Sequence, residues 1–560
     1  MRALIVLCGL AGCTDGTYIV ITVDKRPAVH DAAKFSVTLT NEGSMRTDAL
    51  PLNGDAFPLT FSVSAPGRTG DLGITIDALD ANNLLVGRGA TSTALDVPTA
   101  ALILDSADFV VNTDVANDQF LSDDFEAAGL QLAASTDGTW IATFRDMPCS
   151  SCNIYGRRFD ASGTAITSAV AASTNAFTLT TTLTQITAQV AVAAGSGKIL
   201  AFWDFADTVG TGQGVACRAL DMTGAALPSQ LPIATDVGTD VVSATALSNG
   251  NYAVAWNAPI AGGLSQIRTI IARPDCTTVI ANPVAISASS GTLGARRAHV
   301  TANMANVFYA WIVDNKDVHV RGANNGAGFP TGANDVTFLP HTATQQVDHV
   351  RVAPLGTGFA VVVRWSTSTG TGPGKIELYR STPLGVMTGG PTLVTDKSGS
   401  DFLSDKAFGV ATRSDGALMV VWHQCEAGGG SCDVFGRVLR PSGVPVGDPF
   451  ALATTTQNDQ INPSVVAIGA DAFVASWNDA SAQVPDPAGT AVRARVIYPV
   501  YDQAAGVLGA RCGGSSAACK TGLTCAMGSE GDQRCYQSCD PAVPPVCPNG
   551  GTCTSGACTF

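Results

Sequence analysis

Short apolar segments and polar turns alternate along most of the chain in a unit that repeats. One apolar segment of each unit ends on an aromatic residue, and these residues are Phe144, Trp203, Trp256, Trp311, Trp365, Trp422 and Trp477. Their near-constant spacing, about 55 residues, is typical of architectures in which one supersecondary unit stacks on the next. The seven aromatic positions therefore predict seven structural repeats.

The order of predicted strands is the same in each repeat. An apolar strand leads into a turn such as Asp137-Gly138 or Asp415-Gly416, whose residues tolerate the positive φ of tight hairpin turns. The strand with the terminal aromatic residue follows, then a polar loop, a third strand and, after a Ser-Gly turn, a fourth. Four short strands in each of seven repeats predict an all-β protein built around a seven-bladed β-propeller. The aromatic ring would fill the wedge between neighbouring blades.

The two ends of the repeat region complement each other. The last repeat ends with its third strand, at residues 491–497, and its fourth strand is missing downstream. Residues 109–113 (FVVNT) instead resemble residues 450–454 (FALAT), the fourth strand of the sixth repeat. We therefore expect the N-terminal strand to complete the final blade and close the ring, which removes free sheet edges that otherwise promote aggregation.

The third strand carries a family resemblance. In the first repeat it lies within IYGRRFDASG (residues 154–163), and its counterpart in the sixth is DVFGRVLR (residues 433–440). The first segment resembles the repeat of large bacterial surface proteins with IYGQRFD-type motifs, followed by a glycine and an extended FxVNT strand. The resemblance covers roughly residues 106–500 and is clearest in the first and sixth repeats. It implies a propeller and a surface location, and little else, because most of those proteins have no defined function.

The first residues have the features of an export signal. A short positive start is followed by apolar residues 4–11, which are too few to span a bilayer. Residues 10–13 (LAGC) resemble a bacterial lipobox, in which the cysteine, here Cys13, is lipidated and becomes the mature N-terminus. The next residue is Thr14 and not the aspartate that retains some lipoproteins at the inner membrane. The resemblance therefore implies a lipid-anchored protein of the outer membrane or cell surface.

The segment before the repeats has a strand-like alternation of apolar and polar residues. Examples are residues 18–23, 34–40 and 72–76, with turn signals such as Asn53-Gly54 between such segments. About seven such strands without a sustained helical period predict a β-sandwich of immunoglobulin-like type. Next to a lipid anchor, this domain would act as a stalk.

The C-terminal segment is rich in cysteine. Its eight cysteines are Cys512, Cys519, Cys525, Cys535, Cys539, Cys547, Cys553 and Cys558. An even number at this density in an exported chain predicts four disulfides in a small domain, although eight cysteines allow 105 pairings. A zinc site is the alternative, which the absence of histidine from the segment disfavours. Residues 547–553 (CPNGGTC) resemble the CxNGGxC element of EGF-like modules, but the CxC pattern that follows in those modules is absent.

Six more cysteines fall within the repeats. Two pairs occupy the loop after the aromatic-ended strand, Cys149 with Cys152 in the first repeat and Cys425 with Cys432 in the sixth. Local disulfides are the simplest prediction for both pairs, because a redox-active CxxC normally needs a helix N-terminus to lower its thiol pKa. Cys217 and Cys276, in the second and third repeats, are predicted to pair across neighbouring blades.

Composition narrows the function classes. The formal net charge is −14, and no run of lysine and arginine occurs, which disfavours a nucleic-acid partner. None of the six histidines has the spacing of an HExxH metal site, and no GxSxG or phosphate-binding loop is present. We therefore assign no catalytic residue, no metal ligand and no cofactor.

Carboxylates nevertheless follow the aromatic-ended strand in several repeats, where the loops of a propeller converge on one rim. The candidate rim residues are Asp146, Asp204, Asp314 and Asp479. A ring of such groups could bind a cation or sugar hydroxyls, or work as an acid–base pair. Calcium is possible, but no DxDxDG spacing supports it, and solvated polar loops are the favoured interpretation.

The chain thus divides into residues 1–13 as signal peptide, 14–105 as sandwich, 106–505 as propeller and 506–560 as disulfide-rich domain. We expect a monomeric, non-enzymatic, lipid-anchored protein whose propeller rim binds a polysaccharide, a cell-wall component or an envelope protein. A propeller-type glycoside hydrolase or lyase and a purely structural envelope component are the alternatives.

Overall fold

The structure, a computed structural model, describes most of the N-terminal and repeat regions and part of the C-terminal segment. The residues described are 18–54, 56–112, 119–120, 132–146, 154–166, 176–178, 190–195, 198–206, 213–221, 226–235, 240–260, 262–287, 294–324, 336–339, 345–367, 374–396, 401–403, 408–426, 431–469, 471–486, 489–499, 523–527, 533–537, 552–554 and 557–559. Every regular element in these ranges is a β-strand, and none of them contains a helix that could cross a membrane.

The N-terminal domain is one seven-stranded sheet. Its strands are β1 (Tyr18–Lys25), β2 (Lys34–Asn41), β3 (Ser44–Pro51), β4 (Leu59–Ser64), β5 (Asp71–Leu79), β6 (Leu85–Ala94) and β7 (Thr99–Ser106), paired in the order β3-β2-β5-β6-β7-β1-β4. Alternate residues of these strands, such as Ile21, Ile76 and Leu104, point into a single apolar core. The predicted alternation is therefore present, with one face buried in most of these strands, whereas β3 is exposed apart from Leu50 and its half-buried neighbour Asp48.

The strand order of this domain differs from that of an immunoglobulin constant domain. There the second strand pairs with the first and fifth, and the third pairs with the sixth in the opposite sheet. Here β2 pairs with β3 and β5, and β1 pairs with β7 in parallel. Alternation in the sequence specifies which side chains are buried but not which strands pair, so it could not distinguish these arrangements.

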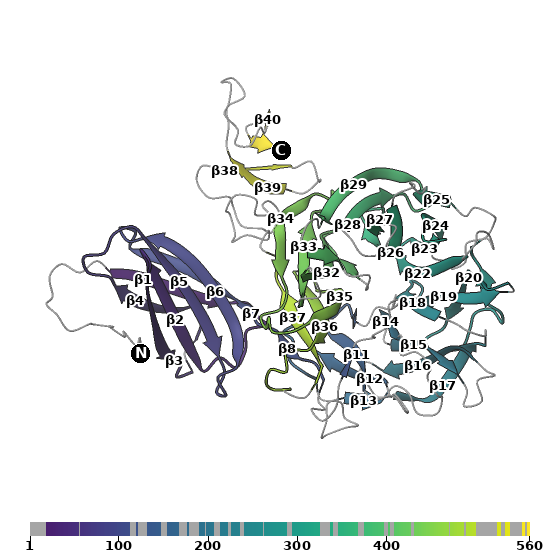
Figure 1. Cartoon of the computed structure of the whole chain (residues 1–560), viewed down its shortest axis with the longest axis horizontal. Helices are drawn as coiled ribbons and strands as arrows, with labels where there is room; N and C mark the ends of the chain where they lie inside the picture. The colour runs from purple at the N-terminus through teal and green to yellow at the C-terminus, as the bar shows by residue number, and fades with distance from the viewer. Residues whose placement is uncertain are drawn as a thin grey trace.

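The repeat region forms seven sheets arranged as a ring, as predicted (Figure 1). The first sheet contains β9 (Gln119–Phe120), β10 (Leu132–Ala134), β11 (Trp140–Asp146), β12 (Ile154–Phe159) and β13 (Ala176–Thr178). The second contains β14 (Val190–Gly195), β15 (Lys198–Ala206), β16 (Gln213–Asp221) and β17 (Ala226–Ala234). The third contains β18 (Asp240–Ala246), β19 (Tyr252–Ile260), β20 (Leu264–Ala272) and β21 (Val284–Ala285).

The fourth and fifth sheets are β22 (Ala295–Ala302), β23 (Asn306–Val313), β24 (Asp317–Asn324) and β25 (Val336–Leu339), and β26 (Gln345–Leu355), β27 (Gly358–Thr367), β28 (Lys375–Ser381) and β29 (Met387–Asp396). The sixth is β30 (Asp401–Leu403), β31 (Gly409–Thr412), β32 (Leu418–Glu426), β33 (Cys432–Leu439) and β34 (Pro445–Ala451), and the seventh begins with β35 (Gln460–Ile468), β36 (Ala472–Asp479) and β37 (Ala491–Ile497).

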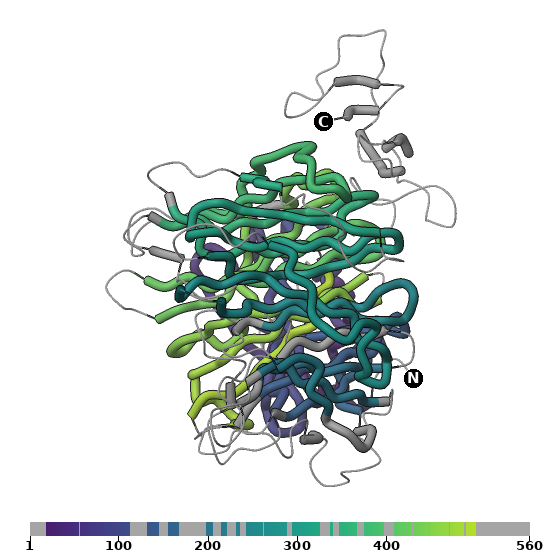
Figure 2. The backbone as a smooth tube through the Cα atoms, turned by 90° about the vertical axis from the view of Figure 1, so that its right-hand side faces the viewer, coloured from purple at the N-terminus to yellow at the C-terminus, as the bar shows by residue number. Residues whose placement is uncertain are grey.

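The innermost strands contact one another all the way round. Contacts run from β10 through β14, β18, β22, β26, β31 and β35 and return to β10. Successive strands within each blade are antiparallel, so the chain reverses at two opposite rims (Figure 2). We call the rim that carries the first-to-second and third-to-fourth strand turns, for example residues 247–251 and 441–443, the turn rim. The opposite rim, which carries the second-to-third strand loops and the connections between blades, is the loop rim.

The N-terminal strand closes the ring. β8 (Phe109–Val110) pairs antiparallel with β37, and the Val111 amide donates to the Val492 carbonyl at 2.7 Å. Phe109 also lies 5.7 Å, between ring centroids, from Phe159 of the first blade. The predicted closure is therefore confirmed, and β8 forms the outer strand of the seventh blade, in contact with the first blade.

The aromatic residues that mark the repeats are buried between blades. Trp256, Trp311 and Trp477 have no exposed surface, and each packs in an apolar cluster that includes residues of the preceding blade. The expected wedge-filling role is confirmed. This role explains the regular spacing of the aromatic residues in the sequence, because each blade needs one such ring at the same position in its second strand.

A recurring arginine of the third strand also joins blades. It lies two positions beyond the residue that pairs with the aromatic marker and donates to a backbone carbonyl of the preceding blade. The bonds are Arg157 to Val111, Arg321 to Ile286, Arg437 to Val394 and Arg495 to Leu452, at 2.7, 2.8, 2.7 and 3.0 Å. Burial lowers the pKa of Arg157 and Arg495 below the ordinary arginine value.

The N-terminal domain is attached to the closing blade by more than the chain itself. The Ser106 hydroxyl donates to the Val496 carbonyl at 2.6 Å, and Arg495 Nε donates to the Ser106 carbonyl at 2.7 Å. The Arg26 guanidinium lies 5.5 Å from the centre of the Tyr498 ring. These contacts join β7 and its surroundings to the end of β37.

The described part of the C-terminal segment consists of two hairpins. β38 (Leu523–Met527) pairs with β39 (Gln533–Gln537), and β40 (Thr552–Thr554) pairs with β41 (Ala557–Thr559). Cys525 is opposite Cys535, and Cys553 is opposite Cys558. Cys13, Cys149, Cys152, Cys512, Cys519, Cys539 and Cys547 lie outside the described residues.

Candidate functional site

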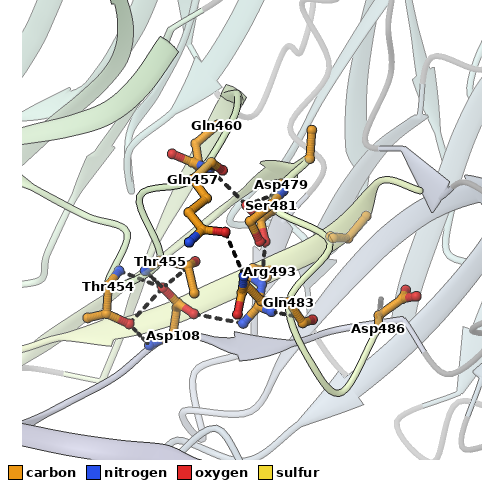
Figure 3. Close-up of polar contacts among 12 residues, drawn as sticks. Asp108, Thr454, Thr455, Gln457, Gln460, Asp479, Ser481, Gln483, Asp486 and Arg493 are labelled. Carbon is orange, nitrogen blue, oxygen red and sulfur yellow. Dashed lines mark hydrogen bonds and ion pairs between the residues drawn. The ribbon is translucent and has the colours of Figure 1, made fainter. Parts of the chain in front are cut away.

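A buried charged network lies where the ring closes (Figure 3). Arg493 on β37 contacts two carboxylates, Asp108 through Nη1 at 2.9 Å and Asp479 through Nε at 2.5 Å. All three side chains are at most 4% exposed. The guanidinium offsets one of the two carboxylate charges in a place where isolated charges would be costly, so the remaining negative charge depends on hydrogen bonds for its stabilisation.

The remaining oxygen atoms of these carboxylates are also hydrogen-bonded. Asp108 Oδ2 accepts from the Thr454 amide and hydroxyl at 2.6 and 2.8 Å. Asp479 accepts from Gln460 Nε2 at 3.0 Å and from the Ser481 hydroxyl at 2.6 Å. The network therefore connects the segment before β8, the connection into the seventh blade and the blade itself. We call Asp108, Asp479 and Arg493 the closure triad.

Asp479 is one of the four rim carboxylates singled out from the sequence, and the structure gives it a structural environment. It is 1% exposed and held by Arg493, so it does not face solvent at the loop rim. The sequence pattern placed it correctly at the end of the aromatic-ended strand. It could not show that Arg493, opposite Trp477 in the neighbouring strand, would turn this carboxylate inward.

The other three candidates do not gather into a described cluster. Asp204 is 3% exposed in β15, directly after Trp203. Asp314 has a positive φ of 56° in the turn between β23 and β24, and its Oδ1 accepts from the Gly294 amide at 3.2 Å. Asp146 ends β11, but its side chain lies outside the described part of the structure.

Three further carboxylates approach one another between the sixth and seventh blades. Burial raises the pKa of Asp433, and the negative charges of Glu426 and Asp459 raise it further. Asp459 also accepts from the Cys432 amide at 2.9 Å. Within the residues that the structure describes, however, no group of three or more potential ligands is arranged to hold a metal ion.

Among the described residues of the propeller, two disulfides are present. Cys217 of β16 is joined to Cys276, in the turn after β20, and so links the second and third blades. Cys425 is joined to Cys432, which lies opposite it in the β32–β33 hairpin. These are the pairings expected from the positions of the four cysteines.

A cavity bordered by described residues opens at the turn rim. Its volume is about 890 Å³, and its walls come from turns of the first, third, fourth, fifth and sixth blades. Turns of five blades can border one space only at the axis of the ring, so this cavity is the mouth of the central channel. It faces away from the loop rim on which the sequence analysis placed its candidate residues.

The walls of this cavity are held by bonds within and between turns. The Thr412 hydroxyl donates to the Pro354 carbonyl of the neighbouring blade at 2.6 Å. Asp415 accepts from the Ala417 amide at 3.1 Å and pairs with Arg413 at 2.6 Å. Arg413 also donates to the Asp471 carbonyl of the seventh blade at 2.7 Å. The mouth is therefore a preformed surface.

Sequence reasoning did not find this cavity. The only signal was the recurrence of short polar turns, Asp137-Gly138, Asn249-Gly250 and Asp415-Gly416, which predicts hairpins and nothing about their meeting point. Gly138, Gly250 and Gly416 have φ values of 86°, 82° and 87°, so the turn geometry itself was predicted correctly. Only closure of the ring brings these turns together.

No protein-family model matches the sequence, and no curated protein matches it significantly. Solved structures that resemble the fold include a protein of unknown function from Dyadobacter fermentans, with a TM-score of 0.40 and 9% identity over 70% of this chain and 98% of that one. AofleA from Arthrobotrys oligospora has a TM-score of 0.37 and 10% identity over 62% of this chain and 90% of its own.

The GH93 α-L-arabinofuranosidase of Fusarium graminearum, solved with arabinobiose, has a TM-score of 0.38 and 10% identity, over 70% of this chain and 98% of its own. Likenesses of this degree carry no argument about what this chain binds or does. The seven-bladed ring is established by its own strand pairings.

Proposed function

We propose that this chain is a non-catalytic binding protein of the bacterial cell envelope, anchored at the outer membrane or cell surface by a lipid on Cys13. The propeller would bind a polysaccharide, a cell-wall component or an envelope protein. The N-terminal domain would act as its stalk, and residues 506–560 would form a module stabilised by disulfides. Monomeric action suits a ring that is already closed by its own N-terminal strand.

The observation that carries this proposal is that a candidate rim carboxylate is buried in an ion pair and is not available to a substrate. Asp479, the candidate with the most completely described surroundings, is buried in the closure triad and does not reach solvent. An acid–base pair needs two carboxylates that face a substrate on either side of the bond to be broken. The structure instead supports a rigid platform whose charged groups hold the ring together.

The proposed location is supported by the disulfides. Cys217–Cys276 and Cys425–Cys432 are bonds that persist in oxidising compartments outside the cytoplasm. Metabolic labelling of cells with a fatty acid tests the anchor directly. We expect label on the wild-type chain and none on Cys13→Ala, and label on neither would contradict the lipid anchor.

The binding role is tested with the purified full chain against immobilised envelope polysaccharides, cell-wall fragments and envelope proteins, with and without calcium. Saturable binding of one of these is the expected result. A folded protein that binds none of them would overturn the binding role and favour the purely structural alternative.

The enzymatic alternative is tested in the same samples by release of reducing ends or unsaturated sugars. Asp146 is the informative position, because Asp479→Asn would disturb the closure triad whether or not the protein is an enzyme. Turnover that Asp146→Asn abolishes, with an unchanged melting temperature, would replace our proposal with a glycoside hydrolase or lyase.

A further inference from the structure

The mouth of the central channel at the turn rim has the dimensions of a ligand site. Its volume, about 890 Å³, falls within the range of about 300–1,000 Å³ typical of small-molecule pockets. The inner strands that end there are packed into the ring on both sides. Such a site needs no rearrangement before a ligand enters, which lowers the entropic cost of binding.

The groups that line this mouth are polar but carry no net charge. Hydroxyls come from Ser135, Thr136, Ser248 and Ser414, and a carboxamide comes from Asn303. Among the described lining residues the ionised side chains are Arg413 and Asp415, and they pair with each other at 2.6 Å. Arg413 and Asp415 neutralise each other, so neither is available to pair with a charged ligand. The lining therefore favours neutral molecules that carry hydroxyl groups.

Apolar surface is interleaved with these hydroxyls. Met304 stands at the lip, 85% exposed, and Pro354 and Pro441 border the same space. A long, unbranched thioether adapts to irregular surfaces, and an exposed one at the edge of a cavity is available for contact. Alternating hydroxyl and C–H surface is the chemistry of a sugar ring, which presents hydroxyls at its edge and C–H groups on its faces.

The backbone of the mouth argues against a peptide. An extended peptide binds most readily by adding a strand to an open sheet edge. Here the turns use their own backbone groups, with the amides of Gly138, Gly250 and Gly416 donating to carbonyls three residues earlier at 3.1, 3.0 and 2.9 Å. The net charge of −14 would in addition repel anionic polymers.

We propose that the turn-rim mouth of the propeller channel binds the end of a neutral carbohydrate chain. This inference rests on the proposed binding function and specifies its ligand class and its face. It also moves the binding surface from the loop rim to the opposite rim.

The test measures binding of the purified full chain, in a non-glycosidic detergent, to short neutral oligomers of glucose, galactose, mannose and xylose by calorimetry. Ser248→Trp and Ser414→Trp each place a bulky ring at the mouth, and both positions are exposed, so the fold should tolerate them. Lys316→Trp is the matched control, an exposed residue of a loop-rim turn. A melting curve of each variant verifies folding.

We expect the wild type to bind one neutral oligomer, both mouth variants to lose at least about tenfold in affinity and Lys316→Trp to retain it. Binding that Lys316→Trp weakens and the mouth variants leave intact would overturn the choice of rim. If no neutral oligomer binds but the screen proposed above finds a charged polysaccharide or an envelope protein, the neutral carbohydrate class is overturned while the binding function stands. No binding of any probe would overturn both proposals together.

Discussion

At the scale of single residues, the closure triad shows how a few buried charges hold a large ring. Arg493 lies between Asp108, from the segment before β8, and Asp479 of the seventh blade. Removing one member of a buried pair leaves a charge without compensation, which typically costs about 3–5 kcal/mol. The triad is therefore the most sensitive point of the closure.

Replacing Arg493 with methionine should lower the free energy of unfolding by about 3–5 kcal/mol, because it leaves two buried carboxylates facing each other. Urea unfolding followed by tryptophan fluorescence measures this loss. The matched control is Arg88→Met, which breaks an ion pair with Asp77 at 52% and 27% side-chain exposure and should cost about 1 kcal/mol or less. Equal losses in the two variants would contradict a special role for the triad.

His299 predicts a response to acid. It is 2% exposed on β22, and its Nδ1 accepts from the Val352 amide of the next blade at 3.3 Å. Burial, together with the positive charge of Arg351, lowers the pKa of His299 well below 6.5. The folded state therefore holds this imidazole neutral, whereas the unfolded chain takes up a proton near its ordinary pKa.

Because the folded pKa lies below the unfolded one, the contribution of His299 to stability is complete above about pH 6.5 and is lost as the pH falls below that value. The loss is at most about 1.4 kcal/mol per pH unit for one proton. Melting temperatures between neutral and mildly acid pH should fall less steeply for His299→Gln than for the wild type. A His299→Gln slope equal to the wild-type one would refute the assignment.

At the scale of elements, the third strand is the part of each blade that fastens it to its neighbour. Its arginine donates to a buried carbonyl of the preceding blade in four of the described blades. In the sixth blade the residue before this arginine is Gly436, and close packing explains why a glycine stands there. A Cβ on Gly436 would lie 2.8 Å from the Met419 side chain, so the motif combines close packing with an inter-blade bond.

Arg437→Met tests the inter-blade bond. The variant leaves the buried carbonyl of Val394 without this donor, and hydrogen bonds to charged groups contribute about 1.5–3 kcal/mol. We expect a loss in that range in chemical unfolding. Arg46→Met, at a 57% exposed arginine of the N-terminal domain, is the control and should change stability by less than about 1 kcal/mol. A loss for Arg437→Met no larger than for the control would mean that the bond contributes little.

Element-scale features were the most predictable from sequence. The aromatic markers and the glycines at positive φ are local signals, and both occupy the places expected of them. The third-strand arginines recur at residues 157, 321, 437 and 495, but no motif singled them out, and the sequence does not show their partners. A hydrogen bond to a carbonyl about 45 residues earlier, such as Arg157 to Val111, leaves no mark on the sequence of the acceptor, because any residue provides a backbone carbonyl.

At the scale of the whole molecule, two disulfides constrain the chain to different degrees. Cys217–Cys276 spans 59 residues and joins two blades, whereas Cys425–Cys432 spans 7 residues within one hairpin. The entropy removed from the unfolded chain grows with the logarithm of loop length. On this account the longer bridge stabilises the fold by about 2 kcal/mol more than the shorter one.

The paired variants Cys217→Ala/Cys276→Ala and Cys425→Ala/Cys432→Ala allow this comparison within one protein. Chemical unfolding should show the larger loss for the inter-blade pair, by about 2 kcal/mol. The reverse order would indicate that the short bridge holds a loop on which the rest of the blade depends.

What the sequence by itself determined was the repeat and everything local to it: seven units, their strand order, their turns and the missing strand that closes the ring. These follow from periodicity and turn chemistry, which act over a few residues. Only the tertiary structure decided which strands of the N-terminal domain pair, that Asp479 faces Arg493 and not solvent, and that turns of five blades enclose one cavity. The physical reason is that these features depend on which distant segments meet when the ring closes. Ring closure results from many contacts along the whole chain, so no single position in the sequence specifies it.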